Sequence, residues 1–129
     1  MIVVDSSAAI DLILLGEGSR FAGRLLDAGE SLQAPHLIDV EVAQVLRRLV
    51  RVGGLTADRA GRALDYFLNL PVSRHPHSHL LPRIWQLRNN LTAYDAAYVS
   101  LAEALRVPLL TLDTRLARAH GHSAVIELA

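Results

Sequence analysis

The chain has 129 residues and contains neither cysteine nor lysine, so its thirteen basic residues are all arginines, and thirteen acids bring the net charge to zero. These absences exclude disulfides, thiolate nucleophiles, cysteine-ligated zinc, Schiff-base chemistry and the lysine of a phosphate-binding loop. A neutral chain also lacks a bulk attraction for nucleic acid. A nucleic-acid function would therefore require locally clustered arginines or a metal ion that offsets the acids.

Apolar runs and helical spacing predict strands and helices that alternate along the chain. In chain order, we expect these elements: strand 2–4, helix 8–15, helix 19–28, strand 32–35, helix 39–52, helix 56–70, strand 71–74, helix 80–89, helix 92–106, strand 108–113, helix 114–120 and strand 124–126. This order is typical of a doubly wound parallel sheet. The predicted fold class is α/β, with a central, mainly parallel sheet of four to five strands between two helical layers, in a single domain over residues 1–129.

Capping signals and apolar faces locate several of these helices. Asp39 is predicted to be the N-cap of the helix that follows it. Thr92 and Asp95 have the spacing of a capping box, in which a hydroxyl and an acid satisfy the first free N–H groups of a helix. Trp85 is expected on the apolar face of the helix over 80–89.

No apolar stretch approaches the roughly 18 residues that cross a bilayer, and no charged segment precedes an apolar one as in a signal peptide. We therefore expect a cytoplasmic protein with no membrane partner. The mean hydropathy is +0.27. This value is high for a small chain and predicts an apolar surface that a partner or a second copy covers.

Asp5 follows the buried apolar run over 2–4 directly, and Ser6 and Ser7 come after it. In an open parallel sheet, ligands bind in the crevice beyond the carboxyl ends of the strands. Asp5 therefore occupies the position at which proteins of this fold class bind ligands and place catalytic residues. On these residues alone, the favoured interpretation is that Asp5 or Ser6 only caps the following helix.

Three further acids share the position of Asp5 in the predicted fold. Asp113 ends a strand, whereas Glu41 and Asp95 fall in the first turns of helices. Each has a structural explanation as a cap or as a complement to the helix dipole. However, strand ends and the starts of the helices that follow them lie on one rim of a parallel sheet. We therefore expect the four carboxylates to point into one crevice.

Such a cluster needs a cation or protons, because two like charges about 4 Å apart repel by roughly 1 kcal/mol in water and about 4 kcal/mol at an effective dielectric of 20. Carboxylate and hydroxyl oxygens are ligands that suit Mg²⁺ or Mn²⁺ rather than zinc or copper. The chemistry that these ions support is hydrolysis of a phosphodiester, which requires no side-chain nucleophile.

Three alternating histidines, His75, His77 and His79, suggest a second metal site. Pro76 lies among them, and no further ligand stands at a spacing typical of zinc. The favoured interpretation is therefore that they are solvated residues of a loop.

Taken together, the acidic motifs resemble those of PIN-domain ribonucleases, and most closely the VapC-type toxins of bacterial toxin–antitoxin pairs. The resemblance covers essentially the whole chain, in the expected order and at the expected length. It rests on Val-Asp-Ser-Ser-Ala at 4–8, the helical Glu41, Leu-Thr-Ala-Tyr-Asp-Ala-Ala-Tyr at 91–98 and Leu-Leu-Thr-Leu-Asp-Thr-Arg-Leu at 109–116. The two motifs in the second half are the specific part.

The resemblance implies a PIN-like fold and an Mg²⁺- or Mn²⁺-dependent endoribonuclease that acts as a toxin. It also implies a homodimer, a cognate VapB-type antitoxin, and contact with operator DNA only through that antitoxin. The metal-binding acids of the family correspond to Asp5, Glu41, Asp95 and Asp113. Ser7 matches the small hydroxyl residue two places after the first acid. Asp5 and Asp95 would be the principal ligands, with Glu41 and Asp113 completing the pocket or positioning water, and Ser7 orienting a carboxylate or water.

Two other functions remain open on the sequence. The chain is either a nuclease or a non-catalytic interaction module whose acids only cap helices, and a nuclease could act on structured DNA instead of RNA. Joint binding of Mn²⁺ by the acids would distinguish the nuclease from the interaction module. The exposed arginines have two interpretations as well, either contacts to RNA phosphate or antitoxin, or a solvated helix face. They are Arg47, Arg48, Arg51, Arg115 and Arg118.

Overall fold

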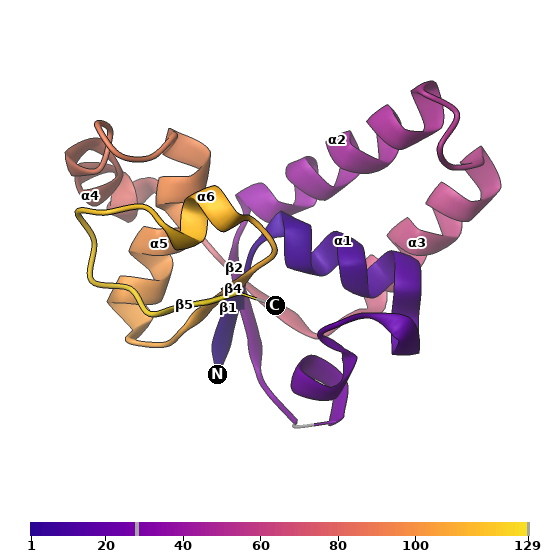
Figure 1. The fold of residues 1–129 in the computed structure, drawn as a ribbon, viewed down its shortest axis with the longest axis horizontal. Coiled ribbons are helices and arrows are strands. Elements are labelled where there is room, and N and C mark those ends of the chain that lie inside the picture. The colour runs from indigo at the N-terminus through magenta and orange to yellow at the C-terminus, as the bar shows by residue number, and fades with distance from the viewer. Residues whose placement is uncertain (28, 129) are drawn as a thin grey trace.

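A single parallel sheet lies at the centre of the molecule (Figure 1). The computed structural model describes residues 1–27 and 29–128. The strand order is β3-β2-β1-β4-β5, and all neighbouring strands pair in parallel. The strands are β1 (Ile2–Val4), β2 (Leu32–Pro35), β3 (Val72–His75), β4 (Leu109–Thr111) and β5 (Ile126–Leu128). The predicted α/β class with four to five mainly parallel strands is confirmed.

Helices cover both faces of this sheet, which gives three layers (Figure 1). α1, α2 and α3 lie on one side, where α2 and α3 form an antiparallel hairpin that reaches beyond the sheet, and α4 and α5 lie on the other. The helices are α1 (Ser6–Leu15), α2 (Leu37–Arg51), α3 (Ala57–Asn69), α4 (Leu81–Gln86), α5 (Ala93–Leu105) and α6 (Thr114–Ala117). Shorter turns are η1 (Gly16–Gly18), η2 (Gly23–Asp27) and η3 (Ser78–Leu80). Within the described residues, no helix has the length and apolarity that a membrane crossing requires.

The central strand β1 is an apolar run that pairs on both edges. Ile2 and Val3 are fully buried, as expected for a strand covered by helices on both faces. The Asp5 N–H donates to the Leu110 carbonyl oxygen at 3.3 Å. This bond extends the pairing past the end of β1 and brings Asp5 beside the carboxyl end of β4.

The helix α5 packs against β1, β2 and β4. Its residues 96–102 are all buried, and three of them are alanines, which allow the helix to approach the sheet closely. The N-cap is Thr92, whose Oγ1 accepts from the Asp95 N–H at 3.2 Å. The Thr92 hydroxyl of the predicted capping box therefore caps the start of α5 and fixes the backbone position of Asp95.

Three local predictions were wrong. The N-cap of α2 is His36, so Asp39 lies in the first turn, and its carboxylate pairs with Arg74 at 2.7 Å. The segment over 19–28 forms only the π-helical turn η2, and the predicted helix end at residue 28 lies outside the described residues. Trp85, which was expected on the apolar face of its helix, is 68% exposed.

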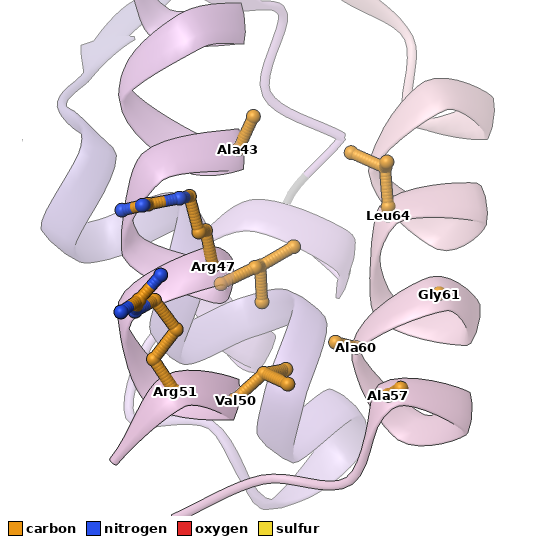
Figure 2. Close-up of a pocket in the computed structure, with 9 residues that line it drawn as sticks. Ala43, Arg47, Val50, Arg51, Ala57, Ala60, Gly61 and Leu64 are labelled. Carbon is orange, nitrogen blue, oxygen red and sulfur yellow. The ribbon is translucent and has the colours of Figure 1, made fainter.

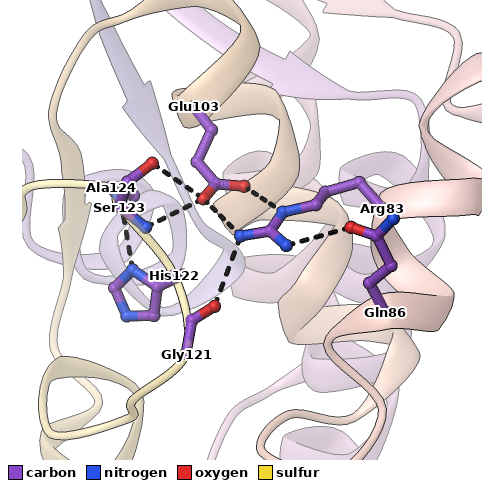
Figure 3. Close-up of polar contacts among 7 residues, drawn as sticks. All are labelled: Arg83, Gln86, Glu103, Gly121, His122, Ser123 and Ala124. Carbon is purple, nitrogen blue, oxygen red and sulfur yellow. Dashed lines mark hydrogen bonds and ion pairs between the residues drawn. The ribbon is translucent and has the colours of Figure 1, made fainter.

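A cluster of hydrogen-bonded polar residues connects the segment before β5 to the helices α4 and α5 (Figure 3). The Glu103 carboxylate of α5 accepts two hydrogen bonds from the Arg83 guanidinium of α4, both at 2.9 Å. It also accepts from the N–H and hydroxyl of Ser123 at 2.8 and 3.0 Å. The Arg83 guanidinium holds the pKa of Glu103 at about 2, so this carboxylate is ionised throughout the neutral range.

Candidate active site

The predicted acids gather at the carboxyl edge of the sheet. Glu41, Asp95 and Asp113 line a single cleft of about 620 Å³, together with residues of α2 and the start of α5. Asp5 lies against this group with only 5% of its surface exposed. Glu41, Asp95 and Asp113 therefore share one cleft at this rim, whereas the buried Asp5 is not among the residues that line it. Glu41 lies in the second turn of α2 rather than in the first.

Asp5 is both a helix cap and a buried carboxylate held by hydroxyls. Its Oδ1 accepts from the Ala8 N–H at 3.0 Å, which caps α1, and from the Ser7 hydroxyl at 2.6 Å. Its Oδ2 accepts from the Thr111 hydroxyl. The two interpretations of Asp5 are thus compatible, because capping uses one oxygen and leaves the carboxylate fixed at the sheet edge.

Ser7 at the start of α1 and Thr111 at the end of β4 both form hydrogen bonds to the Asp5 carboxylate. The Ser7 hydroxyl donates to Asp5 and accepts from the Leu112 N–H at 2.9 Å. Thr111 is fully buried, and its hydroxyl also accepts from the Asp113 N–H at 2.9 Å. Two hydroxyls therefore set the orientation of one acid and the backbone position of another.

Tyr98 positions Glu41, a role that the sequence motifs did not indicate. The ring is 1% exposed, and the phenol donates a hydrogen bond to Glu41 Oε1. Burial, together with this carboxylate, raises the pKa of the Tyr98 phenol far above its ordinary value. The signal available in the sequence was the hydroxyl itself, because a buried tyrosine hydroxyl normally has a partner.

The cleft is electrostatically unfavourable for carboxylates. Burial is the main cause that raises the pKa of Asp5, Glu41 and Asp95 above their ordinary values. Neighbouring acids raise these pKa values further, with Asp113 acting on Asp5 and on Asp95. A cation in the cleft would relieve both the burial cost and the mutual repulsion.

The available ligands suit one class of ion. Within residues 1–27 and 29–128, no group of three or more His, Asp or Glu side chains is close enough together to hold a metal ion by itself. The carboxylates instead line the walls of an open cleft. Magnesium commonly binds through one or two carboxylates while keeping several waters and taking phosphate oxygens from the substrate. An open, all-oxygen cleft fits that mode and does not fit a closed zinc site.

The alternating histidines form no metal site in the described part of the chain. His75 belongs to β3, and its Nε2 lies 2.6 Å from Gln33 Oε1 on the neighbouring strand. His79 is exposed in η3. The expectation of a solvated loop is wrong for His75, whose ring bridges two strands.

The arginines divide between two surfaces. Arg48 and Arg115 line the acidic cleft, whereas Arg118 is exposed at the end of α6. Arg47 and Arg51 border a groove of about 380 Å³ between α2 and α3, whose floor is apolar (Figure 2). The helix α2 therefore contributes one side to the acidic cleft and another to an apolar groove.

The model of the PIN domain family matches residues 2–121. The chain belongs to the PIN domain family. Within this family its relatives are VapC ribonucleases. Ribonuclease VapC9 of Mycobacterium tuberculosis is 50% identical over 116 residues, which are 90% of this chain and 88% of that protein. The resemblance of the acidic motifs to VapC-type PIN domains is thus confirmed.

Solved structures agree with this assignment to the PIN family. PAE2754 from Pyrobaculum aerophilum superimposes with a TM-score of 0.72 and 26% identity, over 90% of this chain and 83% of that one. A toxin–antitoxin complex from Klebsiella pneumoniae gives a TM-score of 0.60 and 21% identity, over 92% of this chain and 91% of that chain. The second likeness concerns the fold alone.

Proposed function

We propose that the protein is an Mg²⁺- or Mn²⁺-dependent endoribonuclease and the toxin of a type II toxin–antitoxin pair. The observation that carries this proposal is the single cleft at the sheet edge, where Glu41, Asp95 and Asp113 meet beside the buried Asp5. Membership of the VapC group of PIN domains supports RNA as the substrate.

Asp5 and Asp95 would be the principal ligands of the ion, which would keep several waters and take phosphate oxygens from the substrate. When bound, such an ion lowers the pKa of water and offsets the negative charge of a phosphodiester. Ser7 and Thr111 hold the carboxylate of Asp5 in one orientation, so little rearrangement is needed during the reaction. The remaining acids, Glu41 and Asp113, complete the pocket and position water.

Two protein partners are part of the proposal. A cognate VapB-type antitoxin is supported by the VapC relatives and by the fold that the chain shares with the toxin–antitoxin complex. The apolar groove between α2 and α3 offers such a partner a surface, with Arg47 and Arg51 at its border to pair with acids (Figure 2). A homodimer is consistent with the exposed large apolar side chains. Operator DNA would be contacted only through the antitoxin.

The test is cleavage of total cellular RNA by purified protein with Mg²⁺, Mn²⁺ or EDTA, beside the variant Asp95→Asn. We expect discrete metal-dependent cuts and a loss of at least about 100-fold in the variant, because an amide lacks the negative charge with which the Asp95 carboxylate would bind the ion. The matched control is Asp58→Asn. Asp58 also lies in the first turn of a helix, but it is exposed on α3 and should leave cleavage unchanged.

Each contrary outcome points to a different alternative. Full metal-dependent activity in the Asp95→Asn protein would remove Asp95 from the mechanism. Cleavage of structured DNA in preference to RNA under the same conditions would change the substrate class. A folded wild-type protein that neither cuts RNA nor binds Mn²⁺ would favour the interaction module.

A further inference from the structure

The acidic cleft carries an exposed aromatic ring that the proposed chemistry does not use. Tyr94 lines the cleft beside Asp95 and is 61% exposed. It occupies the first turn of α5, a helix whose residues 96–102 are all buried. The start of α5 therefore presents an aromatic ring next to a candidate metal ligand.

Exposure alone would not distinguish this ring, because single exposed apolar residues are normal. Trp85 is more exposed, at 68%, but it does not border the cleft, and the Arg88 guanidinium lies 4.7 Å from its ring centroid. The cation–π contacts found in the described residues involve Phe67 and Trp85. The Tyr94 ring is thus distinguished by its place among the acids and by a face that no described guanidinium covers.

Two arginines flank the same cleft. The Arg115 side chain is 91% exposed, and its Nε lies 3.9 Å from Asp113 Oδ1, which is a loose pairing. Arg48 lies on α2 one turn beyond Gln44, and both line the cleft with Arg115. Because guanidinium groups stay charged and match phosphate geometry, these side chains suit the backbone of a nucleic acid on either side of the acids.

From this juxtaposition we propose that Tyr94 is a stacking platform for an unpaired RNA base and that Arg48 and Arg115 hold the adjoining phosphates. This inference rests on the proposed nuclease function and adds a binding determinant to it. A base can stack on the ring only if its face is free, so the arrangement selects a single-stranded segment over a duplex. Base–aromatic stacking is sequence-tolerant, since every base has a π-face.

The binding test uses the Asp5→Asn background, in which RNA is expected to remain uncut, and fluorescence anisotropy with a labelled 12-nucleotide oligouridine. Adding Tyr94→Ala should weaken binding roughly 5- to 150-fold, the range for loss of one stacked base. Tyr94→Phe keeps the ring and should bind within about twofold. The matched control is Tyr66→Ala, since Tyr66 is a 40% exposed tyrosine on α3 outside the cleft, and it should have no effect.

A second measurement asks whether the ring meets a base. Oligouridines with one abasic position are scanned along their length. In the Asp5→Asn protein, an abasic site at one position should lower the binding affinity as much as Tyr94→Ala does. Once Tyr94 is replaced, the same abasic site should lower the affinity no further. A 12-base-pair duplex should bind independently of Tyr94. Thermal melts of each variant confirm that the exposed substitution leaves the fold intact.

Several results would overturn the proposal. Equal binding by the Tyr94→Ala and parent proteins, no measurable oligouridine binding by the parent, or a uniform abasic profile would each remove the stacking role. If RNA binding is unchanged while Tyr94→Ala weakens binding of a VapB-type antitoxin, the ring belongs to that interface instead. Failure of the nuclease proposal is read separately, from absence of cleavage by the protein with Asp5 intact.

Discussion

At the scale of single residues, the Tyr98–Glu41 hydrogen bond links the two helical layers across the cleft. Tyr98→Phe removes this donor and keeps the ring that fills the core. We expect Mn²⁺ affinity to fall roughly tenfold, because residues that orient a metal ligand typically contribute 10- to 100-fold to affinity. Calorimetric titration with Mn²⁺ measures the effect without depending on activity.

A double-mutant cycle with Glu41→Gln tests whether Tyr98→Phe lowers the Mn²⁺ affinity through Glu41. If Tyr98 acts through the Glu41 carboxylate, the two losses of affinity should not add. Fully additive losses would show that Tyr98 acts elsewhere. Thermal melts of the single variants control for a general loosening of the core.

At the scale of elements, Glu103 connects α5, α4 and the segment before β5 (Figure 3). Glu103→Gln should lower the free energy of unfolding at pH 7 by about 1–2 kcal/mol, a range reduced because Arg83 is partly exposed. The pKa of Glu103 is about 2 in the folded protein and ordinarily 4.5. A lowered pKa stabilises the fold above the ordinary value, so this contribution should be lost as the pH falls from 4.5 towards 2.

Urea unfolding between pH 7 and 3 checks this dependence. The difference between wild type and Glu103→Gln should be constant down to about pH 5 and shrink below it. Glu17→Gln, an exposed glutamate in η1, is the control and should show no such trend. A pH-independent difference would mean that the carboxylate charge does not hold the cluster together.

The elements also show which parts of the fold local sequence could predict. β1 and the start of α5 were correct because a buried apolar run and a capping box are signals carried by adjacent residues. Asp39 was placed wrongly because its partner, Arg74, lies 35 positions away on β3. Trp85 was expected to be buried because its helix has an apolar periodicity, whereas exposure depends on what the rest of the molecule leaves uncovered.

The site was predictable to a similar degree. Glu41, Asp95 and Asp113 line one cleft, as the rule for strand and helix ends predicts, whereas the role of the four acids as metal ligands stays a prediction. The Thr111 hydroxyl that fixes Asp5 and the phenol that fixes Glu41 were not predicted, since these bonds join residues 106 and 57 positions apart. Sequence spacing identified the ligand candidates, but the contacts that orient them depend on how the layers are packed.

At the scale of the whole molecule, the cleft concentrates negative charge that a cation would offset. Addition of Mn²⁺ at about 100 times its dissociation constant should stabilise the native state by about 2.7 kcal/mol and raise the melting temperature by roughly 5–15 °C. Asp95→Asn should abolish this shift. Without metal, that variant should melt at an equal or higher temperature than wild type, because burial and nearby acids disfavour the Asp95 charge.

Differential scanning calorimetry of EDTA-treated protein, with and without Mn²⁺, provides the measurement. Asp58→Asn again serves as the control and should keep the full shift. An equal shift in wild type and Asp95→Asn would place the ion outside the cleft.

The hydrogen bond between Asp5 and Thr111 also determines when the cleft can assemble during synthesis of the chain. Asp5 precedes Thr111 by 106 positions, so it is translated well before its hydrogen-bond partner. Until β4 has been synthesised and has paired with β1, the Asp5 carboxylate lacks a fixed orientation and the cleft lacks Asp113. A nascent chain that has not yet reached β4 therefore has no assembled cleft.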